Sequence, residues 1–331
     1  MKRLYAIGEA LIDFTPVETG KGISEVKGFE PHVGGAPANV LGAYKILGGE
    51  SSMITKLGED PFGDKIENLF KEYGIGTEHV LRTEEANTSL AFVALKEEGN
   101  REFSFYRKPG ADMLLSEDEI DGDWFNDAFA LHFCSVSLGN YPMREAHVKA
   151  IKAAKERNVL ISFDPNLRFN LWESEDALKK AVLNFLPCVD ILKISDEELE
   201  FITGETDVEK AAKILFSDYA NLKLFIFTAG KDGQRAFTRN TSAIDKAIKV
   251  DAVDTTGAGD AFIGSFLYQL GEKELTPDNI SDLRKEELKE MLNFSGRYAG
   301  MSVLKAGGIQ SYPTKEEVEN FSTYDESSFN M

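Results

Sequence analysis

Hydrophobic residues along the chain occur in short runs that alternate with helix-like patterns. The short apolar runs predict strands at positions 4–7, 129–136, 159–163, 190–194 and 224–228. Between them, apolar residues recur at helical spacing, for example over 38–47 and 146–158. Strands of this kind, separated by helices, are typical of a parallel sheet that is buried on both faces. The pattern therefore predicts an α/β fold, a three-layer α-β-α sandwich with a mostly parallel central sheet.

Two segments break this alternation. Residues 90–95 and 102–107 flank a turn signal at 98–100, and Phe103 and Phe105 alternate with their neighbours, which predicts a half-buried β-hairpin. Residues 14–33 also contain strand-like runs with glycines and no helical pattern. We predict that these pieces form a small accessory β-sheet, although two surface hairpins without a role would give the same pattern. The predicted division is a main α/β domain (1–13, 34–87 and 113–322), the accessory sheet (14–33 and 88–112) and a frayed tail (323–331).

Composition and charge narrow the function classes. The chain has 331 residues, of which 42% are hydrophobic and 28% charged, and this is ordinary globular usage rather than that of a disordered or coiled-coil protein. With 37 basic and 56 acidic residues, the net charge is −19. Such a surface repels nucleic acids and anionic membranes, so we expect neither as a partner. An anionic ligand would need local donors that overcome this field.

The chain shows no signal for secretion, for membrane spanning or for a zinc site. No charge-free apolar stretch reaches 18 residues, and Glu9 and Asp13 interrupt the apolar start of the chain. Cys134 and Cys188 lie inside apolar runs, which indicates buried free thiols in a reducing compartment. No CxxC motif occurs, and the four histidines lack ligand spacing. We therefore expect a cytoplasmic protein without a protein-ligated zinc ion.

A glycine-rich motif with an acidic end carries the clearest chemical signal. The segment at 254–260 has the sequence DTTGAGD, and an apolar helical pattern follows it. Glycines allow backbone N–H groups to turn toward a ligand, and a helix N-terminus adds free donors and a positive dipole end. This arrangement makes an anion hole without a basic side chain, and Asp260 is placed to take a proton from an attacking hydroxyl. Taken alone, this motif is better interpreted as a Gly-rich turn with an ordinary acidic cap at the helix N-terminus.

A second glycine motif precedes an early helix. The segment at 34–40 has the sequence GGAPANV, in which small residues permit close approach of a ligand to the backbone. Asn39 offers both a donor and an acceptor near the start of that helix. Glycine-rich turns are common, so this motif has weight only in combination with the first.

Together, in this order, the two motifs resemble the signatures of ribokinase-like sugar kinases, also called the PfkB carbohydrate kinase family. The resemblance extends from about residue 5 to 313. Within the family the chain is most similar to the fructokinase branch, through the segments at 8–13, 105–112, 164–168 and 192–198. The resemblance implies a ribokinase-like fold in which the accessory sheet is a lid. It also implies an ATP-dependent kinase that requires Mg²⁺, with a site for K⁺, and that converts fructose to fructose 6-phosphate.

The resemblance further implies roles for individual residues. Asp260 would be the catalytic base, Gly257, Ala258 and Gly259 would form the anion hole, and Arg168 would add positive charge. Sugar contacts would come, besides Asp260, from Asp13, Gly34, Gly35, Asn39, Arg107 and Asn166. Nucleotide contacts would come from Ser195, Thr228, Gly230, Gly233, Gly257, Gly259 and Ser295. Glu198 would organise Mg²⁺ through water, and K⁺ would be held by Asp254, Thr256, Ser302, Lys305, Gly307 and Ser311.

Several of these assignments have structural alternatives. Asp13 is expected at the end of the first strand, where it would also serve as a cap, and Glu198 lies in a segment that suits an acidic first helical turn. Arg168 would also be acceptable as a surface cation. The wider family often has Asn where this chain has Ser195, which weakens the case for metal or phosphate contacts there.

The sequence defines the acceptor sugar and the oligomeric state less well than the residues of phosphoryl transfer. Ribose, 2-keto-3-deoxygluconate, tagatose 6-phosphate and a nucleoside are alternative acceptors, and Arg107 and Lys108 would suit a phosphorylated one. A non-catalytic sugar-binding or regulatory protein is the alternative outside the enzyme class, but such a protein would be expected to lose Asp260 or a motif glycine. The edges of an exposed lid sheet can pair with another chain, so a homodimer through the lid is one expected assembly.

Overall fold

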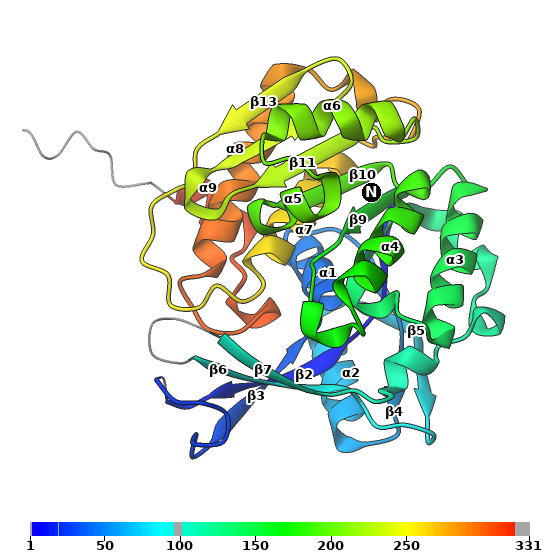
Figure 1. Cartoon of the computed structure of the whole chain (residues 1–331), viewed down its shortest axis with the longest axis vertical. Coiled ribbons are helices and arrows are strands. Elements are labelled where there is room, and N and C mark those ends of the chain that lie inside the picture. The colour runs from blue at the N-terminus through cyan, green and yellow to red at the C-terminus, as the bar shows by residue number, and fades with distance from the viewer. Residues whose placement is uncertain (1, 19, 96–100, 322–331) are drawn as a thin grey trace, which may run out of the picture.

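The computed structural model describes residues 2–18, 20–95 and 101–321. The turn expected at 98–100 and the tail expected at 323–331 lie outside these ranges. The described chain forms a large layered body with a small sheet below it in the view of Figure 1.

The large body is built on a mostly parallel central sheet, as the apolar runs predict. Its strands are β1 (Arg3–Ile7), β4 (Ser51–Gly58), β5 (Gly76–Thr83), β8 (Ala128–Cys134), β9 (Leu160–Asp164), β10 (Ile191–Ser195), β11 (Leu224–Thr228), β12 (Gln234–Phe237) and β13 (Ser242–Asp245). Their spatial order is β13-β12-β11-β10-β9-β8-β1-β4-β5. Neighbours pair in parallel except at one edge, where β12 pairs antiparallel with β11 and with β13. The predicted fold class is confirmed.

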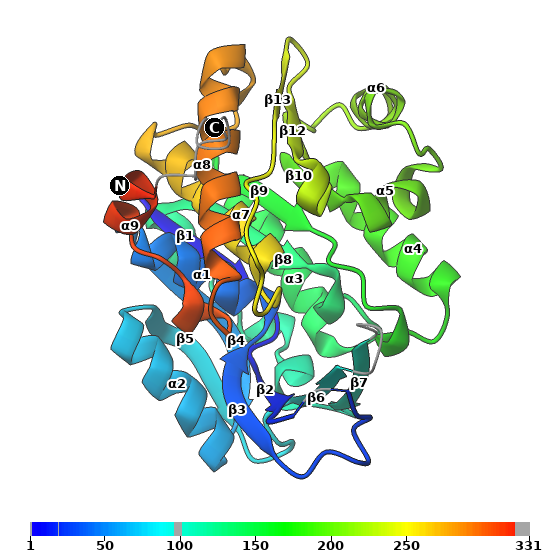
Figure 2. The ribbon, with the colours of Figure 1, turned by 90° about the vertical axis from the view of Figure 1, so that its left-hand side faces the viewer.

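Helices cover both faces of this sheet, which Figure 2 shows nearly edge-on. On one face lie α1 (Ala36–Ile46), α2 (Pro61–Tyr73), α7 (Ala258–Glu272), α8 (Lys285–Ser302) and α9 (Lys315–Asn320). On the other lie α3 (Pro142–Lys155), α4 (Glu175–Phe185), α5 (Asp196–Thr203) and α6 (Val208–Asp218). Each layer buries its apolar residues in a separate hydrophobic cluster against the sheet. This double cover explains why all residues of β4 and β8 are buried and why their sequences do not alternate.

Local sequence signals set the helix ends that matter for the site. Helix α2 begins after Asp60, whose carboxylate accepts hydrogen bonds from the N–H groups of Phe62 and Gly63. It ends at Gly74, which adopts the left-handed conformation with a φ of 72°. Helices α1 and α7 instead begin after Gly35 and Gly257, which have no side chain to act as a cap. The first N–H groups of a helix have no intrahelical acceptor, and in α7 that of Ala258 donates to the carbonyl oxygen of Thr255 at 3.4 Å.

The accessory segments form a separate four-stranded sheet, which we call the lid. Its strands are β2 (Leu11–Pro16), β3 (Phe29–Gly34), β6 (Leu90–Leu95) and β7 (Arg101–Tyr106), in the order β3-β2-β6-β7. The predicted hairpin is present, since β6 and β7 pair antiparallel. The first lid strand starts at Leu11, three residues earlier than the expected boundary. Asp13 therefore lies inside β2, paired with His32, and its expected position at the end of the first strand is wrong.

Two further expectations concern thiols and membranes. Both cysteines are free, and Cys134 is buried as expected, but Cys188 is only partly buried because it lies in the turn that follows α4. Among the helices of the described residues, none combines the length and the apolar character that crossing a bilayer requires.

Candidate active site

The N-terminus of α7 forms the centre of the site. Gly257, directly before this helix, has a φ of 75°, and a Cβ there would lie 2.8 Å from the Tyr312 hydroxyl oxygen. Both the conformation and the space therefore favour glycine. The first turn of the helix presents N–H groups without intrahelical acceptors, and the helix dipole adds positive potential. Asp260 lies in this same turn, and only 6% of its surface is exposed.

Asn39 links the two glycine motifs directly. Its side-chain N–H group donates to Oδ2 of Asp260 at 2.9 Å, across 221 positions of sequence. Burial raises the pKa of Asp260 to about 6, and the neighbouring Asp164 also raises it, whereas Asn39, Lys193 and Arg168 lower it. A carboxylate with a pKa near neutrality is suited to act as a general base.

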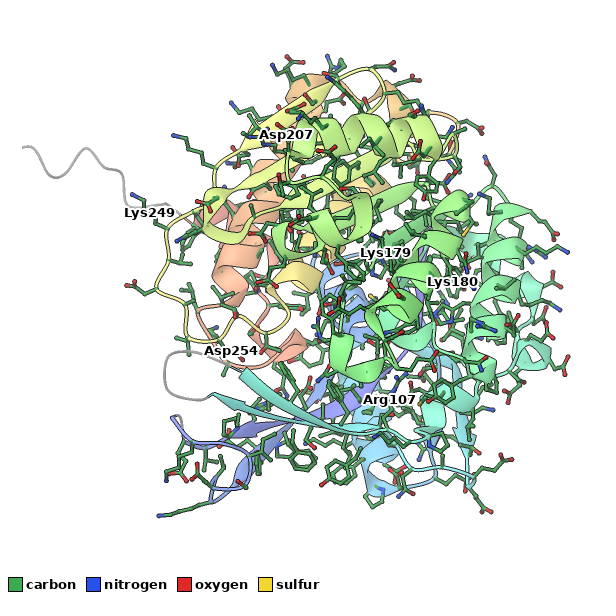
Figure 3. The ribbon with its side chains drawn as sticks, in the orientation of Figure 1. Arg107, Lys179, Lys180, Asp207, Lys249 and Asp254 are labelled. Atoms are coloured by element: carbon green, nitrogen blue, oxygen red, sulfur yellow. The ribbon has the colours of Figure 1, made fainter. Side chains whose placement is uncertain are left out.

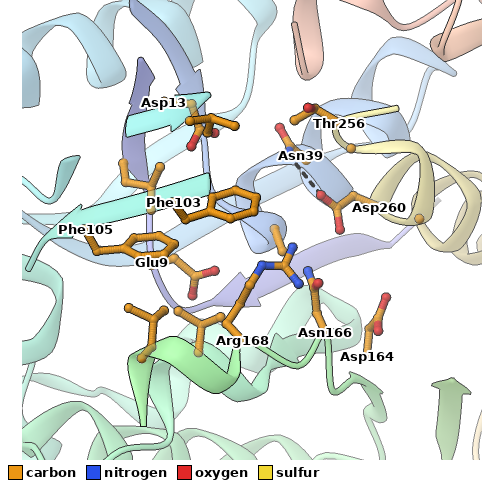
Figure 4. A pocket seen from close by; sticks show the side chains of 18 of the residues that line it. Glu9, Asp13, Asn39, Phe103, Phe105, Asp164, Asn166, Arg168, Thr256 and Asp260 are labelled. Carbon is orange, nitrogen blue, oxygen red and sulfur yellow. Dashed lines mark hydrogen bonds between the residues drawn. The ribbon is translucent and has the colours of Figure 1, made fainter. Parts of the chain in front are cut away.

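A polar cavity opens beside Asp260 and extends beneath the lid. Figure 4 shows its lining, in which Asp13, Asn39, Asn166, Arg168 and Asp260 are polar groups from segments far apart in the sequence. Phe103 and Phe105 of β7 form an apolar wall from the lid side. This orientation agrees with the predicted half-buried hairpin. Of the other predicted residues, Gly35, Thr256, Gly257 and Gly259 also line this cavity.

Asp13 faces this cavity from lid strand β2. Burial raises the pKa of its carboxyl group to about 7, Arg168 lowers it, and the acidic groups around the cavity raise it further. Gly34 of β3 pairs with Leu11 of β2, and a Cβ at Gly34 would lie only 1.9 Å from Oδ2 of Asp13. Gly34 does not itself line the cavity. Glycine is favoured at position 34 because the Asp13 side chain occupies the space that a larger side chain would need.

Sequence reasoning assigned no role to three charged residues that line the cavity, namely Glu9, Asp164 and Lys193. Nζ of Lys193 lies 2.9 Å from Oδ2 of Asp164 in a buried ion pair. Burial opposes the charge on Lys193, but the carboxylates of Asp164 and Glu198 outweigh it and raise its pKa. Asp164 and Lys193 are charged residues at or near the carboxyl ends of apolar strands. This position could have marked them as candidate site residues in the sequence.

A second cavity meets the first at the α7 N-terminus. Thr255 and Gly259 line both cavities, so the segment at 255–259 lies between them. The second cavity is mainly apolar, and its walls come from 228–234, 247–252 and helices α7 and α8. The predicted nucleotide residues Thr228, Gly230 and Gly233 line it, as does Ala258 of the predicted anion hole.

Small residues on α8 make room for this second cavity. Gly296 and Gly300 are one helical turn apart and both line it. A Cβ on Gly300 would lie 2.4 Å from the Ile248 side chain, and one on Gly296 equally close to that of Gln234. A larger side chain at either position would therefore require the Ile248 or Gln234 side chain to move. An apolar cavity of this kind is suited to a nucleobase.

Glu198 has a clear structural role. Its two carboxylate oxygens accept the N–H groups of Leu167 at 2.8 Å and Ser195 at 2.9 Å, and the side chain is buried. It therefore fixes the loop that carries Asn166 and Arg168 against the start of α5. Neither Glu198 nor Ser195 lines either cavity.

The oxygens that suit Mg²⁺ better are those of Asp164. Both are buried and, within the described part of the chain, accept no hydrogen bond, although Lys193 forms an ion pair with one of them. Carboxylate oxygens are preferred ligands of Mg²⁺. The described residues contain no cluster of three or more His, Cys, Asp or Glu side chains that would hold a metal alone. A metal here would need oxygen ligands from a nucleotide and from water.

The residues predicted for K⁺ gather where two loops meet. Asp254 accepts hydrogen bonds from Thr256 at one carboxylate oxygen and from the N–H of Gly307, at 3.3 Å, at the other. Its own N–H donates to the carbonyl oxygen of Val303, which follows Ser302. The hydroxyl of Ser311 donates to the carbonyl oxygen of Gly308. Lys305 is exposed beside this loop.

The structure places two other predicted residues outside both cavities. Arg107 forms a buried ion pair with Asp112 instead of facing the cavity. Ser295 is fully buried between α7 and α8, where its hydroxyl oxygen accepts a hydrogen bond from Gln269 at 3.0 Å. Its neighbour Gly296 lines the nucleotide cavity in its place.

Comparison with known proteins identifies the family. The model of the pfkB family carbohydrate kinases matches residues 1–315. The chain belongs to the pfkB family of carbohydrate kinases. Among relatives in this family, probable fructokinase-6, a chloroplastic protein of Arabidopsis thaliana, is 42% identical over 95% of this chain and 81% of its own length.

Solved structures agree with this assignment. A crystal structure of fructokinase from Xylella fastidiosa with bound ATP has a TM-score of 0.85 and 30% identity, and covers 96% of this chain and 97% of its own. A fructokinase double mutant from Vibrio cholerae O395, with fructose, ADP and potassium ion bound, has a TM-score of 0.82 and 29% identity. The match covers 97% of this pfkB-family chain and 98% of the Vibrio chain.

Proposed function

We propose that this protein is an ATP-dependent fructokinase that transfers the γ-phosphoryl group of ATP to the 6-hydroxyl of fructose. The observation that carries the proposal is the position of Asp260. It lies in the first turn of α7, held by Asn39, where the polar cavity meets the apolar cavity. The sugar occupies the polar cavity beneath the lid, and ATP occupies the apolar one with its phosphates directed to the α7 N-terminus.

The residues perform an in-line phosphoryl transfer. Asp260 accepts the proton of the 6-hydroxyl while that oxygen forms a bond to the γ-phosphorus, and the bond between the γ-phosphorus and the β–γ bridging oxygen breaks to release ADP. The N–H groups of Gly257, Ala258 and Gly259 stabilise the charge on the transferring group. Arg168, which lines the polar cavity, adds positive charge.

Mg²⁺, when bound with ATP, neutralises charge on the β- and γ-phosphates. We propose Asp164 as the residue that holds it, with Glu198 fixing the adjacent loop. K⁺ would bind where Asp254 meets the 303–308 segment, which supports the nucleotide site from behind. The relatives support these ligands, because ATP is bound in the Xylella structure and fructose, ADP and potassium in the Vibrio structure.

The charges in the polar cavity favour a neutral acceptor. Four carboxyl groups line it, those of Glu9, Asp13, Asp164 and Asp260. Arg107, which would suit a phosphorylated sugar, is neutralised by Asp112 away from the cavity, and Lys193 is paired with Asp164. A sugar phosphate would meet net negative charge in this cavity. Tagatose 6-phosphate is therefore a poor candidate, and an unphosphorylated hexose is favoured.

An acceptor panel tests the proposal. ATP turnover would be measured with fructose, glucose, ribose, 2-keto-3-deoxygluconate, tagatose 6-phosphate and a nucleoside, each with and without K⁺. We expect the highest kcat/KM with fructose and stimulation by K⁺. A preference for ribose or a nucleoside would overturn the fructokinase assignment. An absence of turnover with every acceptor would overturn the assignment as a kinase.

Two further proposals concern cell compartment and assembly. We propose a cytoplasmic location on the basis of the free thiols, and fractionation of the native cell would test it, since one relative is named as chloroplastic. We also propose a homodimer through the lid, because β3 and β7 are edge strands of its sheet. Light scattering that gives the mass of a single chain at working concentrations would contradict it.

A further inference from the structure

The chain crosses between the central sheet and the lid at four places, and residues at these crossings meet in one buried cluster. Glu9 precedes β2, Ser89 precedes β6, Arg107 follows β7 and Gly35 follows β3. A Cβ on Gly35 would lie 2.5 Å from the carbonyl oxygen of Glu9, so these two crossings are in direct contact. The side chains of Glu9, Ser89 and Arg107 are all buried.

Arg107 is the centre of this cluster. Its Nε donates to Oδ2 of Asp112 at 3.0 Å, and the other carboxylate oxygen of Asp112 accepts the hydroxyl of Ser89. Its remaining nitrogens donate to the carbonyl oxygen of Val136 at 3.2 Å and to the hydroxyl oxygen of Ser137 at 3.4 Å. Figure 3 shows Arg107 at the base of the lid, which is the end of the lid sheet that joins the large body. The base of the lid is thereby fixed to the segment that follows β8.

Glu9 is the member of this cluster that reaches the polar cavity. It lines the cavity although only 2% of its surface is exposed, and the hydroxyl of Ser137 donates to its Oε2 at 2.8 Å. Burial raises the pKa of Glu9, and Arg107 is the main influence that lowers it. In the view of Figure 4, the Glu9 carboxylate lies beneath the ring of Phe105, and Arg168 stands between it and Asp260. Glu9 therefore belongs to the wall of the cavity and not to the phosphoryl-transfer groups.

We propose that Glu9 is a specificity-determining residue, whose carboxylate accepts a hydrogen bond from a sugar hydroxyl other than the one that is phosphorylated. The inference rests on the proposed sugar kinase activity. Ser137 and Arg107 are positioning residues that hold the carboxylate at the cavity wall, so that it is oriented before the sugar arrives. A hydrogen bond from a correctly placed sugar hydroxyl would add to that from Ser137 and stabilise this buried carboxylate further. An analogue that lacks this hydroxyl cannot form that bond and is used less well.

The test pairs Glu9→Gln with deoxy analogues of fructose, each of which lacks one hydroxyl other than the 6-hydroxyl. With the wild type, one analogue should lose about 10- to 100-fold in kcat/KM relative to fructose, as expected for a hydrogen bond to a charged group. With Glu9→Gln, the KM for fructose should rise by a similar factor while the KM for ATP stays unchanged. The critical result is the coupling between the variant and the analogue. Glu9→Gln should use the same analogue almost as well as it uses fructose.

Glu30→Gln is the matched control, since Glu30 is an exposed acid on β3 of the lid that does not line the cavity. For every analogue, Glu30→Gln should have the same ratio of kcat/KM to that for fructose as the wild type. The proposal is overturned if the loss caused by each analogue is the same in Glu9→Gln as in the wild type, whatever the absolute rates. If Glu9→Gln does not fold, as thermal melting would show, Ser137→Ala replaces it. That variant frees the carboxylate to move, and it must weaken discrimination against the same analogue.

Failure of this inference and failure of the proposed function give different results. If the wild type does not phosphorylate fructose, the proposed function fails before any variant is compared. The deoxy series is then repeated with the sugar that the acceptor panel identifies. If the wild type does phosphorylate fructose but shows no coupling to Glu9, only the role of Glu9 fails.

Discussion

The hydrogen bond between Asn39 and Asp260 gives a prediction that can be worked out from the structure. The Asn39 side-chain N–H donates to Oδ2 of Asp260 at 2.9 Å in a buried environment. This bond stabilises the ionised form of Asp260, so it lowers the pKa of the base. Replacing Asn39 with Ala removes the donor, and we expect the pKa of Asp260 to rise.

The size of the change follows from the strength of the bond. A hydrogen bond to a charged group contributes about 1.5–3 kcal/mol, which corresponds to about 1–2 pH units. The pKa of Asp260 is about 6 in the intact site, so in Asn39→Ala it should rise to about 7–8. At pH 6.5 the fraction of ionised base would then fall roughly 3- to 25-fold, whereas at pH 9 it would be almost unchanged.

The assay is the pH dependence of kcat/KM for the sugar, because its acid limb reports the free enzyme's base. Asn39 also lines the polar cavity, so the absolute rate of Asn39→Ala is not interpreted alone, and the pH at which the acid limb lies is the quantity to compare. The control is Asn166→Gly, which changes a second asparagine of the same cavity and suits its φ of 46°. An acid limb that does not move in Asn39→Ala, or that moves equally in both variants, would refute the reasoning.

Three further variants test other parts of the site. Asp260→Asn keeps the shape but removes the base, so kcat should fall about 10²- to 10⁴-fold with ATP affinity retained, as steady-state kinetics and nucleotide titration would show. Gly34→Ala places a Cβ 1.9 Å from Oδ2 of Asp13, so it should raise the KM for the sugar more than that for ATP; equal changes would contradict this. A Cβ at Gly259 would lie 3.2 Å from Nζ of Lys193, and Gly259→Val should cost about 10²- to 10³-fold in kcat without loss of folding. A folded Gly259→Val variant with nearly full activity would remove this loop from the mechanism.

The sequence alone determined the fold class and the two glycine motifs. Apolar runs such as 129–136 are continuous because both faces of the sheet are covered, and this property is visible locally. The alternation of Phe103 and Phe105 with their neighbours likewise predicted a half-buried hairpin, and these two rings do face the cavity. Glycine at 257 has a local cause in its positive φ, so the turn before α7 was also accessible from sequence.

Only the tertiary structure decided which charged residues meet. The bond between Asn39 and Asp260 spans 221 positions, and no spacing rule relates two loops at that separation. Arg107 and Glu9 show the same limit, because the family resemblance implied that Arg107 contacts the sugar, whereas sequence reasoning assigned no role to Glu9. The structure turns Arg107 inward to Asp112 and Glu9 toward the cavity. The reason is burial, because a charged group that is removed from water needs a polar or charged partner. That partner comes from a segment distant in the sequence.

The position of Asp13 shows why local patterns mislead at a domain crossing. The sequence predicts that the first strand ends near it, but the chain leaves the central sheet after β1 and starts a lid strand at Leu11. Both are extended, so their hydrophobic patterns run together, and only hydrogen bonding to β3 and β6 distinguishes them. Sequence therefore determined the elements and the chemistry of the motifs, whereas long-range pairing decided which side chains form the site. Those pairings depend on contacts that no local stretch of sequence contains.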